Sequence, residues 1–250
     1  MSATYNPMSL VGKAILVTGA SSGIGQAIAI ECSKLGATII CTARNEERLQ
    51  KTLSMMEGEG HSYIIADLTN PDERQTLVEK LPKLDGVSHN AGIGLTMLTS
   101  FAKDDDVRKL TDANMLSIVS LQSLLLKKRK INKKASLVFM SSVSSHISGY
   151  GNAFYAMGKA GLTAYVRTLA LELASKGIRA NTVHPGMVET QFIRTTHLGD
   201  EQHSDFVKNY PLGRYGNPEE IAHVAAFLLS DAASWVTGSR YFVDGGRMTH

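Results

Sequence analysis

The sequence has few cysteines, little excess charge of one sign and no long hydrophobic run. Only two of its 250 residues are cysteine, which is too few for a disulfide scaffold, and no Cys/His spacing suits structural zinc. A reducing, cytoplasmic location is therefore expected. The formal net charge of +3 is too small by itself to indicate a nucleic-acid-binding protein. No apolar run approaches the ~18 residues of a membrane helix, and residues 1–10 lack the regions of a signal peptide.

What is present is the composition of an ordinary globular protein. The chain is 43% hydrophobic and 20% charged, and a core of this size needs neither a disulfide nor a metal. The eight histidines show no HExxH or paired-ligand spacing, so no metal site is predicted. No Pro/Gly/Ser-rich linker divides the sequence. We expect one domain over residues 1–250, with residues 1–10 as an N-terminal tail.

Short apolar runs alternate with longer helix-like segments along the chain. Strands are predicted at 13–18, 38–42, 62–66, 86–88, 136–140, 179–184 and 241–243. Helices are predicted between them at 26–35, 46–56, 71–81, 103–128, 155–176 and 219–229. Such alternation is typical of a parallel sheet covered on both faces. The expected fold class is α/β, a single Rossmann-type doubly wound domain with a parallel sheet of about seven strands.

A glycine-rich turn joins the first predicted strand to the first predicted helix. The run TGASSGIG occupies 18–25 and places glycines at 19, 23 and 25. Glycine permits positive φ and lets the backbone approach a ligand closely, and the N–H groups that open the helix suit a pyrophosphate. The spacing differs from the common GxGxxG fingerprint. A turn that only packs a helix tightly against a strand is therefore the alternative.

Tyr155 and Lys159 are four residues apart on a predicted helix, so their Cβ atoms should lie ~6 Å apart on one face. A nearby ammonium favours the phenolate, which predicts a lowered pKa for Tyr155. Full activation at neutral pH would need ~4 kcal/mol of differential stabilisation. The alternative is a core tyrosine beside a surface lysine. Ser142 follows the strand predicted at 136–140, so it should lie at the carboxyl edge of the sheet, where ligands bind.

Taken in order, these motifs resemble those of the short-chain dehydrogenase/reductase family. The matching segments are the turn at 18–25, Asn90-Ala91-Gly92, Asn114, Ser142, Tyr155 with Lys159, Pro185-Gly186 with Thr190, and the runs at 236–238 and 243–246. The resemblance extends from about residue 10 to residue 246. Each motif alone is loose, but all of them in this order and spacing are specific.

The resemblance implies an enzyme that interconverts a ketone and a secondary alcohol with a nicotinamide cofactor. It implies that Ser142 binds the substrate carbonyl and that Tyr155 protonates its oxygen. Lys159 would also hold the nicotinamide ribose, and Asn114 would hold a proton-relay water; a plain buried asparagine is the alternative for Asn114. Ser144 is a candidate second contact to the substrate.

The resemblance also indicates the residues that bind the cofactor. These are Gly19, Ser21, Ser22, Gly23, Ile24, Gly25, Arg44, Asp67, Leu68, Asn90, Ala91, Gly92, Tyr155, Lys159, Pro185, Gly186, Val188 and Thr190. The position that is acidic in NAD-preferring members falls on Ala43, and Arg44 follows it. A guanidinium pairs well with phosphate, which favours NADP(H). Against this, Ser22 stands where some NADP-preferring relatives carry a basic residue.

Two of these assignments have structural alternatives. Arg44 is also interpretable as an ordinary arginine at the start of a helix, and Asp67 as a helix N-cap ahead of Pro71. Residues 190–211 form a long connection with a weak pattern, which favours a substrate lid over a poorly patterned surface helix.

Within the family, the 3-oxoacyl-acyl-carrier-protein reductases are the most similar in length and in the segment 211–246. This implies reduction of a β-ketoacyl thioester in fatty acid biosynthesis, a homotetramer, and an acyl carrier protein docked on Lys133 and Lys176. The alternative for the basic run at 126–134 is a solvated helix end. The alternative substrates are a steroid, a sugar or polyol, or another small carbonyl. A non-catalytic dinucleotide-binding sensor is the alternative of another class.

Overall fold

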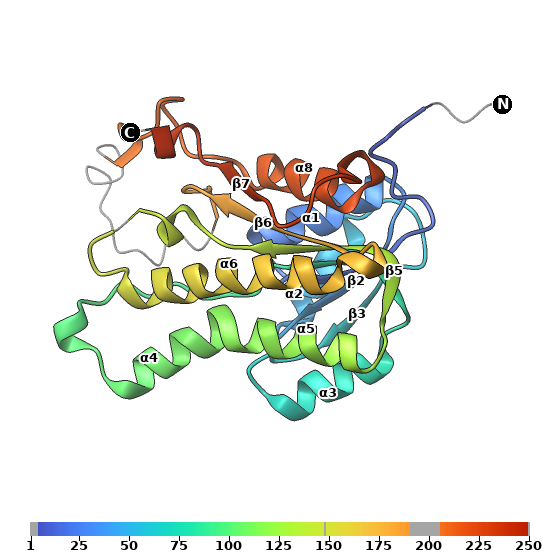
Figure 1. Ribbon diagram of the computed structural model, residues 1–250, viewed down its shortest axis with the longest axis horizontal. Helices are drawn as coiled ribbons and strands as arrows, with labels where there is room; N and C mark the ends of the chain where they lie inside the picture. The colour runs from blue at the N-terminus through green and yellow to red at the C-terminus, as the bar shows by residue number, and fades with distance from the viewer. Residues whose placement is uncertain (1–4, 148, 191–205, 250) are drawn as a thin grey trace.

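The strands form one parallel sheet with helices on both faces (Figure 1). The computed structural model describes residues 5–147, 149–190 and 206–249. Its seven strands lie in the order β3-β2-β1-β4-β5-β6-β7. Their bounds are β1 (Ala14–Thr18), β2 (Thr38–Ala43), β3 (Ser62–Ile65), β4 (Leu84–His89), β5 (Ile131–Met140), β6 (Arg179–Pro185) and β7 (Arg240–Val243). This order confirms the doubly wound parallel sheet that the sequence predicts.

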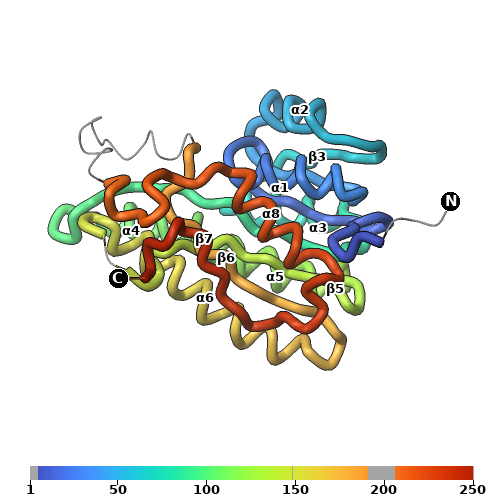
Figure 2. Tube along the Cα trace, turned by 90° about the horizontal axis from the view of Figure 1, so that it is seen from above, coloured from blue at the N-terminus to red at the C-terminus, as the bar shows by residue number. Residues whose placement is uncertain are grey.

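The helices complete two layers around the sheet. They are α1 (Gly23–Lys34), α2 (Glu46–Ser54), α3 (Pro71–Lys80), α4 (Asp104–Thr111), α5 (Ser117–Lys127), α6 (Ala153–Leu173) and α8 (Pro218–Leu229). Buried side chains of α1 and α8 pack on one face of the sheet, and those of α3, α5 and α6 pack on the other. Seen from above, α1 lies between α2 and α8 (Figure 2).

The order of the strands decides where a ligand can enter. The chain runs outward from β1 to β2 and β3, and then returns to place β4 on the other side of β1. Val17 of β1 therefore pairs with Cys41 on one side and with Ser88 on the other. The connections leave this point in opposite directions, which opens a crevice at the carboxyl ends of β1 and β4.

The structure corrects the helix predicted at 103–128. It is divided into α4 and α5 by the π-helical turn η2 (Asp112–Leu116). Asn114 lies in this turn and its Nδ2 donates to the backbone oxygen of Leu110 at 3.0 Å. A side chain that takes a backbone carbonyl competes with the regular helical ladder, and such π-bulges are frequent at functional sites.

The fifth strand is also longer than predicted, because it begins at Ile131 rather than at residue 136. Its pairing with β4 shifts register between Leu84 and Gly86, and Lys134 has a φ of 64°. A bulge of this kind breaks the apolar pattern by which a strand is recognised. The polar residues before 136 therefore belong to the strand although they do not resemble one.

The structure describes only part of residues 1–10, predicted as an N-terminal tail, and only part of residues 190–211, predicted as a substrate lid. Leu10 is fully buried, and its N–H donates to the backbone oxygen of Leu35 at 2.8 Å. Residues 191–205 of the predicted lid lie outside the described residues. Beyond them, the Tyr210 hydroxyl accepts from the Met187 N–H at 3.0 Å, which holds the described end of that segment on the loop after β6. Within the described ranges, no helix combines the length and apolarity needed to cross a bilayer.

Candidate active site

The glycine-rich turn has the shape of a phosphate cradle. Gly19 has a φ of 64° and Gly23 a φ of 54°, a region that side chains with a Cβ rarely adopt. A Cβ on Gly25 would lie 2.4 Å from the backbone oxygen of Gly19, so α1 can approach the turn only with glycine there. Among the described residues, no side-chain cap binds the first turn of α1. Its N–H groups are therefore suited to a diphosphate.

The loop after β4 forms the second wall of the cradle. The backbone N–H groups of Asn90 and Ala91 donate to Thr18 Oγ1 at 3.0 and 3.2 Å, and Asn90 Nδ2 donates to the backbone oxygen of Thr18 at 3.1 Å. A Cβ on Gly19 would lie 3.0 Å from the Ala91 nitrogen. The ends of β1 and β4 are thus locked together at the crevice. The backbone of the Asn90-Ala91-Gly92 motif is thus held in place at this edge by its hydrogen bonds to Thr18.

The predicted reactive residues come together from α6 and the loop that follows β5. Ser142 and Tyr155 are joined by a side-chain hydrogen bond. Lys159 Nζ lies 5.6 Å from the centroid of the Tyr155 ring and donates to the backbone oxygen of Met140 at 2.9 Å. Ser142 Oγ also accepts from the Ser144 N–H at 3.1 Å. The serine, the tyrosine and the lysine therefore form one cluster at the carboxyl edge of the sheet.

The Ser144 side chain faces a helix end. Its Oγ accepts from Asn152 Nδ2 at 2.9 Å, and Asn152 immediately precedes α6. Ser141 binds elsewhere, because its Oγ donates to the Lys159 backbone oxygen at 3.1 Å. Ser144 therefore helps to fix the start of the helix that carries Tyr155.

Asn114 joins the reactive cluster to the cradle. Its Nδ2 donates to the backbone oxygen of Ile93 at 3.0 Å, and its Oδ1 accepts from the Ile93 N–H at 3.1 Å. A Cβ on Gly92 would lie 2.7 Å from Asn114 Oδ1 and 3.5 Å from Lys159 Nζ. The asparagine is fully buried, and it holds the loop after β4 against the lysine. Glycine at 92 leaves the room for this contact.

The electrostatics of the pair differ from the prediction. Burial raises the pKa of Tyr155 to about 12, although its hydrogen bond with Ser142 acts in the opposite direction. Burial also lowers the pKa of Lys159 to about 8. The expectation of a lowered pKa for Tyr155 is therefore wrong for the protein's own groups, because burial raises this pKa more than the hydrogen bond with Ser142 lowers it. At neutral pH Tyr155 keeps its proton, and Lys159 keeps its charge.

Arg44 and Asp67 lie together at the carboxyl ends of β2 and β3. Arg44 Nη1 is 3.8 Å from Asp67 Oδ2. Burial raises the pKa of Asp67, but hydrogen bonds from Thr69 and the charge of Arg44 outweigh it and hold the pKa below its ordinary value. The alternative interpretation of Asp67 as an N-cap is wrong, since Asn70 caps α3.

The loop after β6 closes over the glycine turn. Gly186 N–H donates to the backbone oxygen of Val243 at 3.0 Å, which ties the loop to β7. Val188 is buried, and its backbone oxygen accepts from Thr190 Oγ1 at 3.2 Å. A Cβ on Gly23 would lie 3.2 Å from Thr190 Cγ2. Thr190 is therefore brought directly against the cradle.

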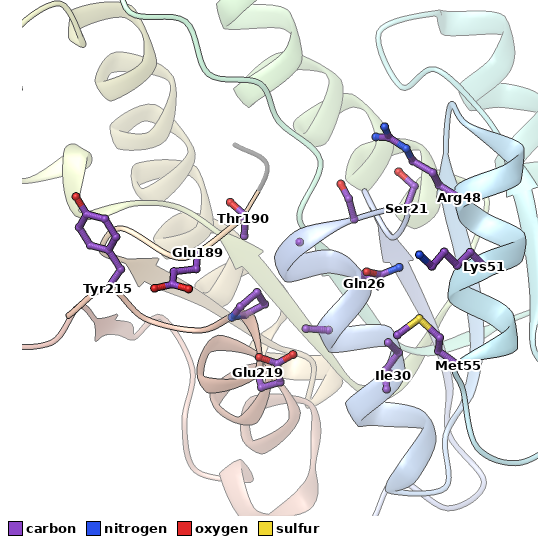
Figure 3. Close-up of a pocket in the computed structure, with 14 residues that line it drawn as sticks. Ser21, Gln26, Ile30, Arg48, Lys51, Met55, Glu189, Thr190, Tyr215 and Glu219 are labelled. Carbon is purple, nitrogen blue, oxygen red and sulfur yellow. The ribbon is translucent and has the colours of Figure 1, made fainter. Parts of the chain in front are cut away.

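A cavity of about 680 Å³ adjoins the cradle between α1, α2 and α8 (Figure 3). The predicted residues Ser21, Ser22, Gly23 and Thr190 line it. Residues that the sequence analysis did not select also line it, among them Arg48, Lys51, Glu189 and Glu219. The sequence held one sign of the two basic residues: Arg48 and Lys51 are three residues apart on a predicted helix, so they share one of its faces.

Lys133 and Lys176 lie away from this site. Both are exposed; Lys133 is near the start of β5, and Lys176 ends the short helix η4 (Ala174–Lys176) that follows α6. Nine residues of extended chain separate Lys133 from Ser142, which corresponds to roughly 30 Å. The two lysines therefore lie near the amino edge of the sheet, opposite the reactive cluster.

Thr18→Val should destabilise the protein by about 1–3 kcal/mol, because it leaves the half-buried N–H groups of Asn90 and Ala91 without their acceptor. Urea unfolding measures the effect. Thr38→Val on the exposed start of β2 is the matched control and should change stability little. Equal midpoints for the two variants would show that the Thr18 hydroxyl does not lock β1 to β4.

Lys159→Met should flatten the pH dependence of stability between pH 8 and 10. The folded-state pKa of about 8 lies below the ordinary 10.5, so the unfolded chain binds more protons in this range and the wild type gains stability as pH rises. The gain attributable to Lys159 over this pH range should be about 2 kcal/mol. Urea unfolding of both proteins at several pH values isolates it. Parallel curves would contradict a lowered pKa.

Comparisons with known proteins agree with this geometry. A family described as Enoyl-(Acyl carrier protein) reductase matches residues 19–248. The 3-oxoacyl-acyl-carrier-protein reductase FabG of Rickettsia felis is 38% identical over 241 residues, which cover 96% of this chain and 99% of the relative.

Two solved structures share the whole fold. A putative gluconate dehydrogenase from Agrobacterium tumefaciens has a TM-score of 0.91 at 26% identity, covering 98% of this chain and 100% of that one. A short-chain dehydrogenase/reductase mutant from Serratia marcescens has a TM-score of 0.88 at 28% identity, covering 97% and 99%. The chain belongs to the short-chain dehydrogenase/reductase family, and it is an oxidoreductase that acts on CH–OH groups with a nicotinamide dinucleotide.

Proposed function

We propose that the protein reduces a 3-oxoacyl thioester to the 3-hydroxyacyl thioester with NADPH. The observation that carries this proposal is the hydrogen-bonded Ser142–Tyr155 pair, with the Lys159 ammonium buried behind it. The similarity to a 3-oxoacyl-acyl-carrier-protein reductase over 96% of the chain supports the substrate class. The protein would act in the cytoplasm, as a step in fatty acid biosynthesis.

Each polar group of the cluster has a distinct proposed role. Ser142 Oγ donates a hydrogen bond to the substrate carbonyl oxygen and orients it. Tyr155 Oη transfers its proton to that oxygen as the carbonyl carbon is reduced. The raised pKa of Tyr155 keeps this proton in place at neutral pH. Lys159 holds positive charge beside the phenol, which stabilises the phenolate that remains after the transfer.

The cradle fits a nicotinamide dinucleotide. When bound, this cofactor supplies the hydride. We assign its diphosphate to Gly19, Ser21, Ser22, Gly23, Ile24 and Gly25, its nicotinamide side to Asn90, Ala91, Gly92, Tyr155, Lys159, Pro185, Gly186, Val188 and Thr190, and its adenosine to Arg44, Asp67 and Leu68. Lys159 would also bind the nicotinamide ribose, and the turn at Asn114 would hold the relay water that returns a proton to Tyr155.

NADP(H) is the proposed form of the cofactor. Ala43 ends β2, so no carboxylate stands at that position to repel a 2′-phosphate. Arg44 follows it with a side chain that is 71% exposed and 3.8 Å from Asp67. A guanidinium at this edge can bind phosphate through two parallel hydrogen bonds. These features favour the phosphorylated cofactor.

We also propose that an acidic acyl carrier protein contacts the exposed Lys133 and Lys176. These lysines lie near the edge of the sheet opposite Ser142, so a tethered acyl group bound at them would have to reach the reactive cluster of another copy. The proposed homotetramer is therefore part of the docking proposal.

Tyr155→Phe and Ser142→Ala should each lower kcat by about 10²–10⁴-fold, since each removes a group that acts on the carbonyl oxygen. NADPH binding should persist. Oxidation of NADPH with a 3-oxoacyl thioester, the corresponding 2-enoyl thioester, a steroid ketone and a sugar measures both reaction and substrate class. Tyr150→Phe, at an 89% exposed tyrosine, is the control.

Three outcomes would overturn parts of this proposal. Unchanged turnover in Tyr155→Phe would remove the tyrosine from its role. Turnover of the enoyl thioester or of another carbonyl in place of the 3-oxoacyl thioester would change the substrate. NADPH binding without turnover of any compound would favour the dinucleotide sensor.

Lys133→Glu combined with Lys176→Glu should raise KM for an acyl-carrier-protein substrate by about 10-fold or more, because two attractions to an acidic partner become repulsions. The KM for a small soluble thioester should not change. Steady-state kinetics with both substrates separates docking from catalysis. The matched control is Lys128→Glu, also on the basic run. An equal change with both substrates would contradict the docking role.

A further inference from the structure

Three basic residues lie on α2 or just before it, and two of them line the cavity beside the glycine turn. Arg44 precedes this helix, Arg48 lies in its first turns and Lys51 lies one turn further on. Arg48 and Lys51 line the cavity of about 680 Å³ together with Ser21 and Ser22 of the turn. We propose that Arg48 is a second cationic contact for the 2′-phosphate of NADP(H) and a determinant of cofactor specificity, an inference that rests on the proposed use of NADP(H).

Arg44 alone is a weak site for a phosphate dianion. Its guanidinium lies 3.8 Å from the Asp67 carboxylate, and the pKa of that carboxyl group is held below its ordinary value by hydrogen bonds from Thr69 and by the charge of Arg44, which outweigh burial. Asp67 is therefore ionised at neutral pH and offsets the charge of Arg44. A phosphate bound beside this pair needs a further cation.

The glycine turn does not supply that cation. The run at 18–25 contains no lysine or arginine, and Ser22 stands next to Gly23 at the start of α1. Arg48 belongs to a different element that lies against the same cavity. Its helix starts after the N-cap Asn45, whose side chain accepts from the Arg48 N–H at 2.9 Å. This cap fixes the first turn of α2, and with it the point from which the Arg48 side chain leaves.

The direction of the side chains distinguishes Arg48 from Lys51. In Figure 3 the Arg48 side chain extends toward Ser21, whereas the Lys51 side chain points toward Gln26 of α1. Arg48 is thus directed at the turn and Lys51 at the flank of the helix. Arg44 precedes the N-cap of α2 and Arg48 lies in its first turn. A phosphate at the edge of the turn would therefore meet the Arg48 guanidinium and the Ser21 hydroxyl, which line the same cavity.

The opposite wall of the cavity is acidic and favours the same placement. Glu189 and Glu219 line the cavity from the side of the β6 loop and α8. Their carboxylates disfavour an anion near that wall. Glu46, in the first turn of α2, accepts from the Tyr63 hydroxyl at 2.8 Å and so faces β3. The cavity therefore has a basic side at α2, and an anion is attracted to that side.

The test compares two adenosine ligands that differ by one phosphate. Binding of 2′,5′-ADP and of 5′-AMP to the full chain is measured by calorimetry for the wild type, Arg48→Ala, Arg48→Lys, Arg44→Ala and Lys51→Ala. Arg48→Ala should weaken 2′,5′-ADP binding about 10-fold, as expected for loss of a charge-assisted contact. Its affinity for 5′-AMP should change less than about twofold. Arg48→Lys should restore part of the loss, and Lys51→Ala should leave the ratio of the two affinities unchanged.

Four other results of these binding measurements would contradict the proposal or the use of NADP(H) on which it rests. Equal losses for both ligands in Arg48→Ala would show a structural role and overturn the proposal. A loss in Lys51→Ala as large as in Arg48→Ala would show a general effect of charge and also overturn it. A wild type that binds both ligands equally would refute the proposed use of NADP(H) itself. A wild type that prefers 2′,5′-ADP, with that preference kept in Arg48→Ala, would refute the role of Arg48 alone.

Discussion

The burial of the Lys159 ammonium is the constraint around which the site is built. Its side chain is 4% exposed, and its Nζ donates to the backbone oxygen of Met140 at 2.9 Å. A buried charge is costly unless nearby groups compensate for lost hydration. Gly92 lacks a side chain, so its loop can approach this nitrogen, and the Tyr155 ring lies 5.6 Å away. A charge kept in this position beside a phenol is the feature on which the proposed chemistry depends.

This arrangement joins the cradle and the reactive cluster into one structure. The Asn114 side chain binds the backbone of Ile93 on the loop after β4, and that loop is locked onto the end of β1 by Thr18. The glycine turn and Lys159 are therefore connected through the loop after β4, which contacts both Thr18 and Asn114. Asn114 lies in the π-helical turn between α4 and α5, so this break in the helix coincides with the contact to the loop.

The parts of the fold that follow from local rules could be predicted from the sequence. Alternation of apolar strands with helices predicts the parallel sheet. The spacing of Tyr155 and Lys159 predicts that they share a helix face, and the position of Ser142 after a strand predicts that it lies at the carboxyl edge. Each inference depends on the periodicity of the backbone. The structure brings these three side chains into one cluster.

The remaining features depend on contacts between distant segments, which periodicity does not reveal. Burial raises the pKa of Tyr155 above its ordinary value, and the burial of this side chain depends on the whole fold. Asp67 and Asn70 both suit an N-cap, and only the path of the chain shows that Asn70 takes this place. Arg48 resembles any exposed helix arginine until α2 is placed beside the cavity. The identity of the substrate likewise lies in loops, since this fold serves relatives with different substrates.

The most direct test of this account is the pKa of Tyr155, measured by NMR titration of the protein labelled with ¹³C at tyrosine Cζ. The Tyr155→Phe variant assigns the signal by its loss. The account predicts a pKa well above the ordinary 10.0 and near 12, because burial disfavours the phenolate. A pKa below 10 would contradict the account and would indicate that the lysine's attraction outweighs burial.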